Sequence, residues 1–236
     1  MSLVLVALQQ PGCTTDSALV NDPVPSAPRF ESIRQLPADG AVSAADLVPG
    51  HDGVEVWVSV EGLLAPNEFD LTTTESAILA GTTSTRTADL ETAHWRVAAD
   101  GSISLERVDS HPDATASLFD PPLLIAPASL TCGADVHAES SMRAVRLPKA
   151  TSKRDRGLAR RTVRYARDED VRWRGEEHRM KVIEVTFTAD LSAAQVERKS
   201  ELWVLPGLGI VAERWRERLV ILKLFPKESG QFAYRR

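Results

Sequence analysis

The chain has 236 residues, 43% of them hydrophobic, and a formal net charge of −5. This length and composition suffice for one sizeable core, and the charge excludes a globally basic nucleic-acid-binding protein. The charge is uneven, because residues 1–141 carry a net −15 and residues 142–236 a net +10. Either strands of the two halves pair and neutralise each other, or the basic half presents a face to phospholipid headgroups or an acidic partner.

The first residues resemble the signal of a bacterial lipoprotein. A short apolar run, Leu3 to Leu8, precedes Gly12 and Cys13, and in such signals the cysteine after a small residue is lipidated on its sulfur. The resemblance implies a signal segment over residues 1–13. It also implies a membrane anchor at Cys13, on the periplasmic side of the bacterial cell envelope. The sequence departs from the usual pattern in having no Lys or Arg before the apolar run.

Residues 14–45 are predicted to be a flexible linker, because they are rich in proline and show the period of neither a helix nor a strand. Residues 46–236 are predicted to form a single β-rich domain. Cys132 has no intramolecular disulfide partner if Cys13 is acylated, and it is predicted to be a small buried apolar residue.

From about residue 50 the strand pattern dominates. Val54 to Gly62 alternates, with the valines on one face and Trp57 among the residues on the other. Asp70 to Gly81 predicts a short helix with a threonine cap. Asp100-Gly101 separates two β-prone runs and predicts a tight hairpin turn, because glycine tolerates a positive φ.

Three further segments are predicted to connect strands. Ser117 to Gly133 contains three prolines among leucine and isoleucine. Because proline cannot donate to a central ladder, this segment is predicted to be an apolar connection that packs against the sheet. Residues 151–161 are predicted to be a charged loop, and Arg167 to Asp170 a hairpin turn.

The second half of the chain continues the strand pattern, and a sheet this long must curl or close. We therefore expect a mainly β fold with few short helices, built as a curved antiparallel sheet or a partly open β-barrel. Its concave face would bind an apolar ligand, or the same side chains would fill the core. The side chains predicted to line this face are Val163, Tyr165, Val171, Trp173, Ile183, Val185 and Phe187.

Pro206, Gly207 and Gly209 form a glycine-rich stretch near the C-terminus. A phosphate-binding loop needs a helix after it, whereas the residues that follow alternate as in a strand. The stretch therefore predicts a hairpin turn, in which proline presets φ and the glycines supply positive φ values. The next strand places Glu213, Trp215 and Glu217 on one face and Arg214, Arg216 and Arg218 on the other.

Two stretches resemble a group of secreted, β-rich bacterial proteins of unknown function. They are Phe119 to Gly133, with its Pro-Pro-hydrophobic-Pro pattern, and Trp203 followed by the turn at residues 206–209 and Ile210-Val211. The resemblance covers about residues 90–220. It implies a fold similar to the curved, partly open β-barrels of the lipoprotein carrier and receptor (Lol-type) proteins of the Gram-negative envelope, and it implies no catalytic residues.

No P-loop, nucleophile-elbow, zincin or Cys-x-x-Cys motif occurs, and no cofactor or metal site is predicted. Asp109, His111 and Asp113 alternate, which fits either metal binding or a polar turn. We expect an exported, lipid-anchored, non-enzymatic envelope protein that binds a hydrophobic or lipid-like ligand, a lipoprotein or another envelope partner, and no nucleic acid. The alternative is an interaction module with a filled core, and a hydrolase-type enzyme is the third hypothesis.

Overall fold

The computed structural model describes residues 30–47, 53–62, 67–75, 81–87, 90–147, 153–222 and 224–236. The predicted signal segment and Cys13 lie outside these residues. Most described residues belong to strands, and one short 3-10 helix, η1, spans Ala44–Leu47. The strands are β1 (Glu31–Pro37), β2 (Ala41–Ser43), β3 (Gly53–Gly62), β4 (Asn67–Glu75), β5 (Thr83–Thr87), β6 (Glu91–Val97), β7 (Ile103–Ser110), β8 (Thr115–Ala126), β9 (Ser129–Thr131), β10 (Asp135–Arg146), β11 (Lys153–Trp173), β12 (Glu176–Leu191), β13 (Ala194–Leu205), β14 (Gly209–Ile221) and β15 (Phe225–Arg235).

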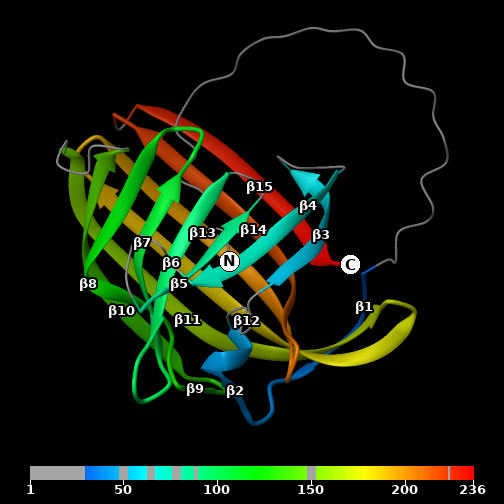
Figure 1. The fold of residues 1–236 in the computed structure, drawn as a ribbon. Coiled ribbons are helices and arrows are strands. Elements are labelled where there is room, and N and C mark those ends of the chain that lie inside the picture. The colour runs from blue at the N-terminus through cyan, green and yellow to red at the C-terminus, as the bar shows by residue number, and fades with distance from the viewer. Residues whose placement is uncertain are drawn as a thin grey trace, which may run out of the picture.

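The strands form one large curved antiparallel sheet and a small second sheet of β2 and β9 (Figure 1). In the large sheet the order of neighbours is β1-β11-β10-β8-β7-β6-β5-β4-β3-β15-β14-β13-β12. β12 also pairs with β11, from Gly157 opposite Leu191 to Trp173 opposite Glu176, so the sheet curls round until these two strands meet. The predicted mainly β fold with a curved antiparallel sheet is confirmed.

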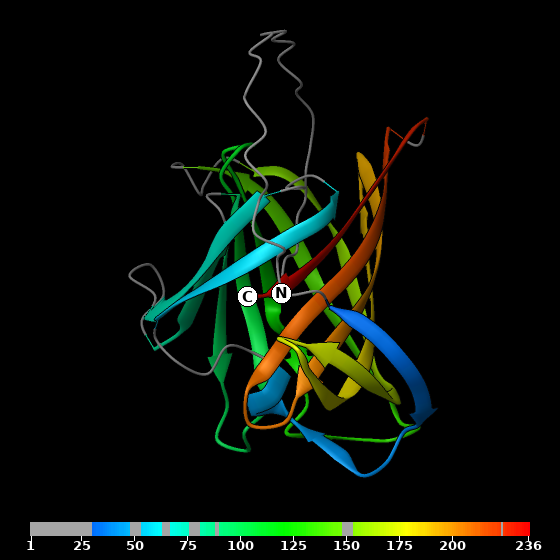
Figure 2. The same cartoon turned by 90° about the vertical axis from the view of Figure 1, so that its right-hand side faces the viewer.

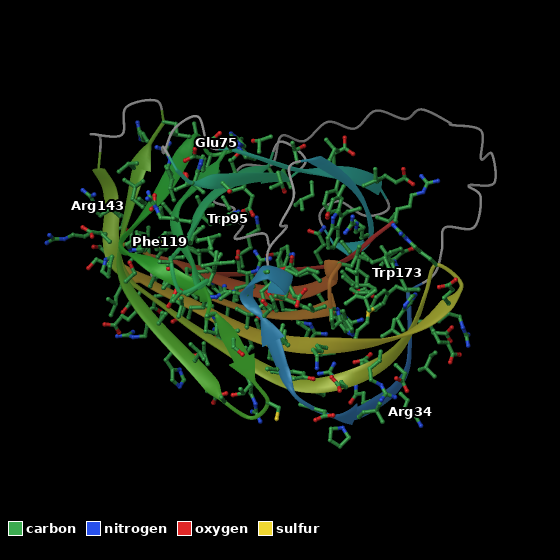
Figure 3. All side chains as sticks on the ribbon, turned by 60° about the horizontal axis from the view of Figure 1, so that its bottom comes forward. Arg34, Glu75, Trp95, Phe119, Arg143 and Trp173 are labelled. Carbon is green, nitrogen blue, oxygen red and sulfur yellow. The ribbon has the colours of Figure 1, made fainter. Side chains whose placement is uncertain are left out.

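The inner face of the large sheet carries the main core. Leu105 on β7, Leu123 on β8 and Ile183 on β12 are at most 1% exposed and belong to it. The small sheet adds Val42 and Leu130 to the same core, and η1 adds Leu47. Figure 3 brings the bottom of the view in Figure 1 forward. There η1 lies across the middle of the space that the sheet surrounds. Burial of this apolar surface is the main stabilising contribution.

The β11–β12 hairpin changes faces part of the way along. The register shifts between Tyr165 and Arg167, which lie opposite Ile183 and Val182. A bulge of this kind moves every later side chain of the strand to the other face of the sheet. Beyond it, the hairpin contributes to a second, outer cluster that contains Phe30, Val58, Val171, Trp173, Met180, Val182, Trp203, Val211, Ala212, Phe232 and Tyr234.

The second cluster ties the hairpin to both ends of the described chain. Trp173 Nε1 donates a hydrogen bond to the carbonyl oxygen of Arg235, at 2.7 Å. The ring of Phe30 packs edge-on against Trp203 and Phe232, with centroids 5.6 and 5.7 Å apart. Each such aromatic pair adds about 1 kcal/mol beyond its buried area. The hairpin extends to the right in Figure 1, beside β1.

Two segments near the N-terminus differ from the expectation. Residues 31–45, predicted as part of the linker, form β1, β2 and the start of η1, while residues 14–29 of that prediction lie outside the described residues. Asp70 to Glu75, the described part of the predicted helix, belong to β4. Leu71 and Thr73 are buried there with half-buried or exposed neighbours, and the β-branched threonines favour this extended conformation.

β8 contains the prolines that were expected to exclude a strand. Pro121 and Pro122 lie where the pairing is interrupted, because the pairing with β7 jumps from Leu123 to Leu118 and the pairing with β10 ends at Asp120. The prolines therefore need not donate a ladder hydrogen bond. The prediction of a connection was wrong, while the apolar residues of this segment are packed in the core as expected.

β11 is one continuous strand, so the predicted charged loop and the predicted turn at Arg167 to Asp170 were both wrong. The turn between β11 and β12 falls later, at Arg174 and Gly175, which have φ values of 55° and 84°. Ladder pairing with β10 and β12 holds the charged part of β11 in the sheet, and its arginines meet carboxylates of the neighbouring strands. Arg160 pairs with Glu139 of β10 at 2.8 Å.

Two tight turns lie where the sequence predicts them. Gly101, with a φ of 85°, lies in the turn between β6 and β7. Pro206, Gly207 and Gly209 lie at the turn between β13 and β14, where the two glycines have φ values of 79° and 91°. The backbone N–H of Gly207 donates to Oδ1 of Asp46 at 2.9 Å, which fixes this turn against η1. No helix in the described parts of the chain is long and apolar enough to cross a membrane.

Candidate binding surface

Two adjoining hollows, of about 520 and 420 Å³, lie on the outer face of β12, β13, β14 and β15. β14 and β15 are the strands drawn in orange and red in Figure 2. Lys199 and Arg216 line both hollows. We call this region the outer trough; its other outward-facing residues are Glu184, Thr186, Glu197, Glu201, Arg214, Arg218, Glu228 and Gly230.

Three exposed arginines of β14 face the outer trough, and two of them lie opposite carboxylates. Arg214 is directly opposite Glu201 of β13, and their charged groups are 4.0 Å apart. Arg218 lies between Glu197 of β13 and Glu228 of β15. At these two positions the sheet itself places negative charge beside each arginine.

The middle arginine, Arg216, has different neighbours. It lies opposite Lys199 on β13 and Gly230 on β15, and Thr186 of β12 lies on the far side of Lys199. Like charges directly opposite each other across a sheet are destabilising. Lys199 does form an ion pair with Glu197 of its own strand at 2.9 Å, but both side chains are exposed, so this pair contributes little. The row is therefore a local excess of positive charge.

Elsewhere the acidic front of the chain pairs with its basic back. Arg172 pairs with Glu31 at 3.1 Å and Arg236 pairs with Glu68 at 2.7 Å. The first interpretation of the charge asymmetry holds for these strands. In the part of the chain that the structure describes, neither Arg216 nor Arg218 takes part in an ion pair.

Two carboxylates at the β12 side of the outer trough already form ion pairs with Arg167 of the β11–β12 hairpin. Arg167 lies 2.9 Å from Glu201 and 3.8 Å from Glu184. Its side chain is 18% exposed, so these pairs are less screened than surface pairs. Arg167 thus offsets negative charge that would otherwise oppose the binding of an anion.

The inner face of the same strands holds a buried ionic network. Arg198 and Glu217 lie directly opposite each other and are 3% and 6% exposed. Nη2 of Arg198 donates to Oε1 of Glu213 at 3.2 Å, and its guanidinium lies 4.3 Å from the centre of the Trp215 ring. Burial raises the pKa of Glu217 to about 7, although the charge of Arg198 opposes this. Burial lowers the pKa of Arg161, on β11, to about 9. Because this value is still above neutral pH, Arg161 remains charged there.

The seven residues predicted to line a ligand cavity are all buried, between 0 and 5% exposed. The bulge in β11 separates them into two groups. Val185 borders the smaller hollow, and the other six line neither hollow. Val163, Tyr165, Ile183, Val185 and Phe187 belong to the main core, and Val171 and Trp173 belong to the second cluster.

Tyr165 also holds the loop between β1 and β2. Its hydroxyl contacts the carboxylate of Asp168 and lies 2.9 Å from the carbonyl oxygen of Asp39. Nζ of Lys181 lies 2.7 Å from both the hydroxyl and that carbonyl oxygen. Burial and the hydrogen bond to Asp168 raise the pKa of Tyr165, so the hydroxyl remains a neutral donor. This arrangement fits a structural tie better than a general base.

The structure does not bring Asp109, His111 and Asp113 together. Asp109 is buried, where it accepts a hydrogen bond from Arg107 at 2.6 Å and lies 3.4 Å from His94. Burial alone would raise the pKa of Asp109, but these hydrogen bonds outweigh it and lower the pKa. His111 and Asp113 lie in the turn after β7. Among the described residues, no group of three His, Cys, Asp or Glu side chains is arranged to hold a metal ion.

Cys132 is exposed, so the prediction that it is buried was wrong. The hydrogen bond and the bridge that Cys132 forms are made by its backbone and not by its thiol. The N–H of Cys132 donates to the carbonyl oxygen of Gly40 at 3.2 Å, and the residue forms an isolated bridge with Tyr165. The thiol can face solvent because these backbone contacts fix the segment beside β9.

The sequence identified the arginine face of β14 but missed Lys199 and Thr186. Counting outward from the turn, which pairs Leu205 with Gly209, would place Lys199 opposite Trp215. A bulge between Trp203 and Val204 shifts the register by one residue and brings Lys199 opposite Arg216. Nothing in the alternation of β13 marks this bulge, so the like-charged pair is visible only in the fold.

Comparisons with known proteins identify no relative. No protein-family model matches the chain, and no curated protein or solved structure gives a significant match. The fold therefore defines the class, an all-β protein with a curved antiparallel sheet and two packed apolar clusters. The resemblance to envelope lipoproteins stays a prediction.

Proposed function

We propose that this protein is a non-enzymatic binding module of the bacterial cell envelope that binds a lipid-like ligand by its anionic headgroup, at the outer trough. The observation that carries the proposal is the like-charged pair Lys199 and Arg216 at the junction of the two hollows, where, among the described residues, Lys199 pairs only with the exposed Glu197 and Arg216 takes part in no ion pair. The apolar side chains first expected to line a ligand cavity are instead at most 5% exposed. A lipid would therefore be recognised from outside the sheet, with its acyl chains left in the bilayer.

The charge distribution supports this site. Residues 142–236 carry a net +10, and they supply both the four cations and the four outward-facing carboxylates of the outer trough, so the local excess of positive charge is confined to the row of Lys199 and Arg216. Anionic membrane surfaces attract basic segments by roughly 1 kcal/mol per Lys or Arg near the surface. A lipid anchor at Cys13 would keep the domain within reach of such headgroups. The packed cores also fit the alternative, an interaction module that binds an acidic envelope protein at the same trough.

Vesicle co-sedimentation tests the proposal. The full chain carrying Cys13→Ser, which removes any anchor, is mixed with phosphatidylcholine vesicles with or without phosphatidylglycerol. We expect binding to the anionic vesicles that weakens as salt is raised, and no binding to the zwitterionic ones. Absence of binding to both would favour the protein-partner alternative.

A matched pair of variants locates the surface. R214E/R218E should abolish vesicle binding, while R143E/R156E, with the same change in net charge, should not. Arg143 and Arg156 are exposed and opposite each other on β10 and β11, and Figure 3 shows Arg143 on the outside of that wall. Equal loss in the two variants would show a response to net charge alone and would refute the proposed surface.

A further inference from the structure

We propose that the outer trough contains a specific site for an oxyanion of the phosphate class, formed by Lys199 and Arg216 with Thr186 and Gly230 on either side. The inference rests on the proposed function, because it names the chemical group by which the trough would hold its ligand. Four observations carry it: the register, the absence of a side chain at Gly230, the surrounding charges and the chemistry of the donors.

The register places the four residues in one row across β12, β13, β14 and β15. Directly opposed residues on one face have Cβ atoms roughly 5 Å apart. The long side chains of Lys199 and Arg216 can therefore converge on one bound group. Thr186 lies beside Lys199 and adds a hydroxyl donor at that end of the row.

At the other end of the row β15 has a glycine. A Cβ built on Gly230 would lie 3.0 Å from the backbone oxygen of Trp215 and 3.6 Å from Cγ of Arg216, so the arginine side chain packs closely over the glycine. Gly230 lines the larger hollow, together with Lys199 and Arg216. A larger residue at position 230 would occupy the space in which an anion could approach the guanidinium.

The neighbouring rows carry carboxylates, whereas the row of Lys199 and Arg216 has none of its own, and the nearest one, Glu197, is exposed and lies 2.9 Å from Lys199. Arg218 lies between Glu197 and Glu228, and Arg214 lies opposite Glu201. An anion displaced by one row along β14 would meet these negative charges. The surrounding charges thus favour one position for an anion, beside Arg216.

The donors match a phosphate group in number and geometry. The planar guanidinium of Arg216 offers paired N–H groups that fit two oxygens of one phosphate, and the ammonium of Lys199 adds up to three donors. Once the exposed Glu197 carboxylate is displaced from Lys199, the two positive charges balance the one or two negative charges of a phosphate diester or monoester. Charge-assisted hydrogen bonds of this kind are about twice as strong as neutral ones.

Titration with inorganic phosphate tests the site directly. The full chain carrying Cys13→Ser is titrated with phosphate, which replaces chloride so that the ionic strength stays constant. The backbone amide resonances are followed by NMR. We expect saturable shifts at the four residues of the row. K199Q and R216Q should each weaken phosphate binding by about tenfold or more, the loss of one charge-assisted hydrogen bond.

R143Q is the matched control. Arg143 is also exposed and also lies opposite a like charge, Arg156, but it lines neither hollow. Its substitution should leave phosphate binding unchanged. The absence of saturable shifts in the parent chain, or an equal loss of affinity in R143Q and R216Q, would overturn the site.

The vesicle assay shows whether the bound phosphate group belongs to a lipid headgroup or to free phosphate. If it is a lipid headgroup, K199Q and R216Q also weaken binding to phosphatidylglycerol vesicles, and free phosphate competes. If phosphate binds but vesicles do not, the site stands and the proposed lipid-binding function fails. If vesicles bind through the trough but phosphate causes no saturable shift, the function stands and the site is refuted.

Discussion

Arg198 on β13 lies directly opposite Glu217 on β14, and the two side chains are 3% and 6% exposed. The hydrogen bond of Arg198 goes to Glu213, and among the described residues its Nη1 has no hydrogen-bond partner. Charges removed from water to this degree cost several kcal/mol unless they are paired. A slip of one residue between the strands would set Arg198 opposite an arginine, Arg216 or Arg218. The buried network thus favours the observed register.

At pH 8, above the pKa of about 7 of Glu217, Arg198→Met is expected to destabilise the protein by about 3–5 kcal/mol, because Glu213 and the ionised Glu217 would lose their buried counter-charge. Chemical denaturation followed by tryptophan fluorescence measures the change. Arg216→Met, on the exposed side of the same sheet, should change the free energy of unfolding by less than about 0.5 kcal/mol. In Arg198→Met/Glu217→Gln the loss should be smaller than in the single variant. A cost below about 1 kcal/mol for Arg198→Met would show that the network does not hold the register.

The stability contributed by Glu217 should depend on pH. Its pKa is about 7 in the folded protein, against an ordinary value of 4.5, so the folded state holds a proton that the unfolded state has released. This contribution is complete below about pH 4.5 and is lost as the pH rises through 7. The loss is on the order of 3 kcal/mol across this window.

Glu217→Gln isolates that contribution from the other carboxylates. The free energy of unfolding of the variant minus that of the wild type should grow as the pH is raised from 4.5 to 8. Arg198 and Lys227 are the charges that oppose the shift, so both are kept in the comparison. A difference that does not change with pH would mean that Glu217 is ionised throughout this range.

Alternation in the sequence revealed most of the strands, because a side-chain period of two is a local property. It could not give the positions of the bulges. Tyr165 and Trp173 fall on one face by counting, yet the register shift before Arg167 sends Trp173 to the outer cluster. The pairing of β11 with β1 and with β12 decides this shift. β1 is distant in the sequence and β12 follows β11 in the chain, so the alternation within β11 does not show either partner. The predicted lining set was divided for this reason.

The buried face of a strand was equally beyond the reach of the pattern. In β3 the valines alternate with polar residues, a pattern typical of a strand with one apolar core face and one solvent-exposed face. Trp57 on the polar side is only 7% exposed, whereas Val54 and Val60 are 61% and 45% exposed. Trp57 stacks on Phe69 of β4, with ring centroids 6.4 Å apart. Val58 on the valine side is buried as well, at 8%, in the second cluster, so both faces of β3 are covered at its middle and the alternation does not single out one core face.

Gly157→Ala is expected to destabilise the β11–β12 pair by about 3 kcal/mol. A Cβ at this position would overlap the carbonyl oxygen of Asp190 on the neighbouring strand, so the strands must move apart. Gly133→Ala is the control, because there the cost is only the positive φ of 75°, with no atom within 4 Å of the added Cβ. It should cost about 1 kcal/mol. Thermal unfolding of both variants gives the comparison, and equal costs would argue against the close approach at Gly157.

Cys13→Ser should release the protein from the membrane fraction of a Gram-negative host. The expectation rests on the resemblance of residues 1–13 to a lipoprotein signal, in which the cysteine sulfur carries the lipid. Fractionation followed by mass spectrometry of the N-terminal peptide measures both location and lipid. Cys132→Ser, at an exposed thiol away from the signal, should leave the distribution unchanged. An unmodified wild-type Cys13 in the soluble fraction would refute the anchor.

Tyr165→Phe should cost about 1–3 kcal/mol and loosen the loop between β1 and β2. The substitution removes the hydroxyl that contacts Asp168 and the carbonyl oxygen of Asp39, and a buried carboxylate that loses a donor is costly. Amide hydrogen exchange of residues 31–43 should accelerate, while exchange in β13 and β14 should not. Tyr234→Phe is matched in burial, at 3% exposed, and its hydroxyl has no hydrogen-bond partner among the residues that the structure describes. It should cost under about 0.5 kcal/mol. Unchanged exchange in β1 and β2 of Tyr165→Phe would mean that the pairing of β1 with β11 and the contacts of Phe30 hold this end of the chain without the Tyr165 hydroxyl.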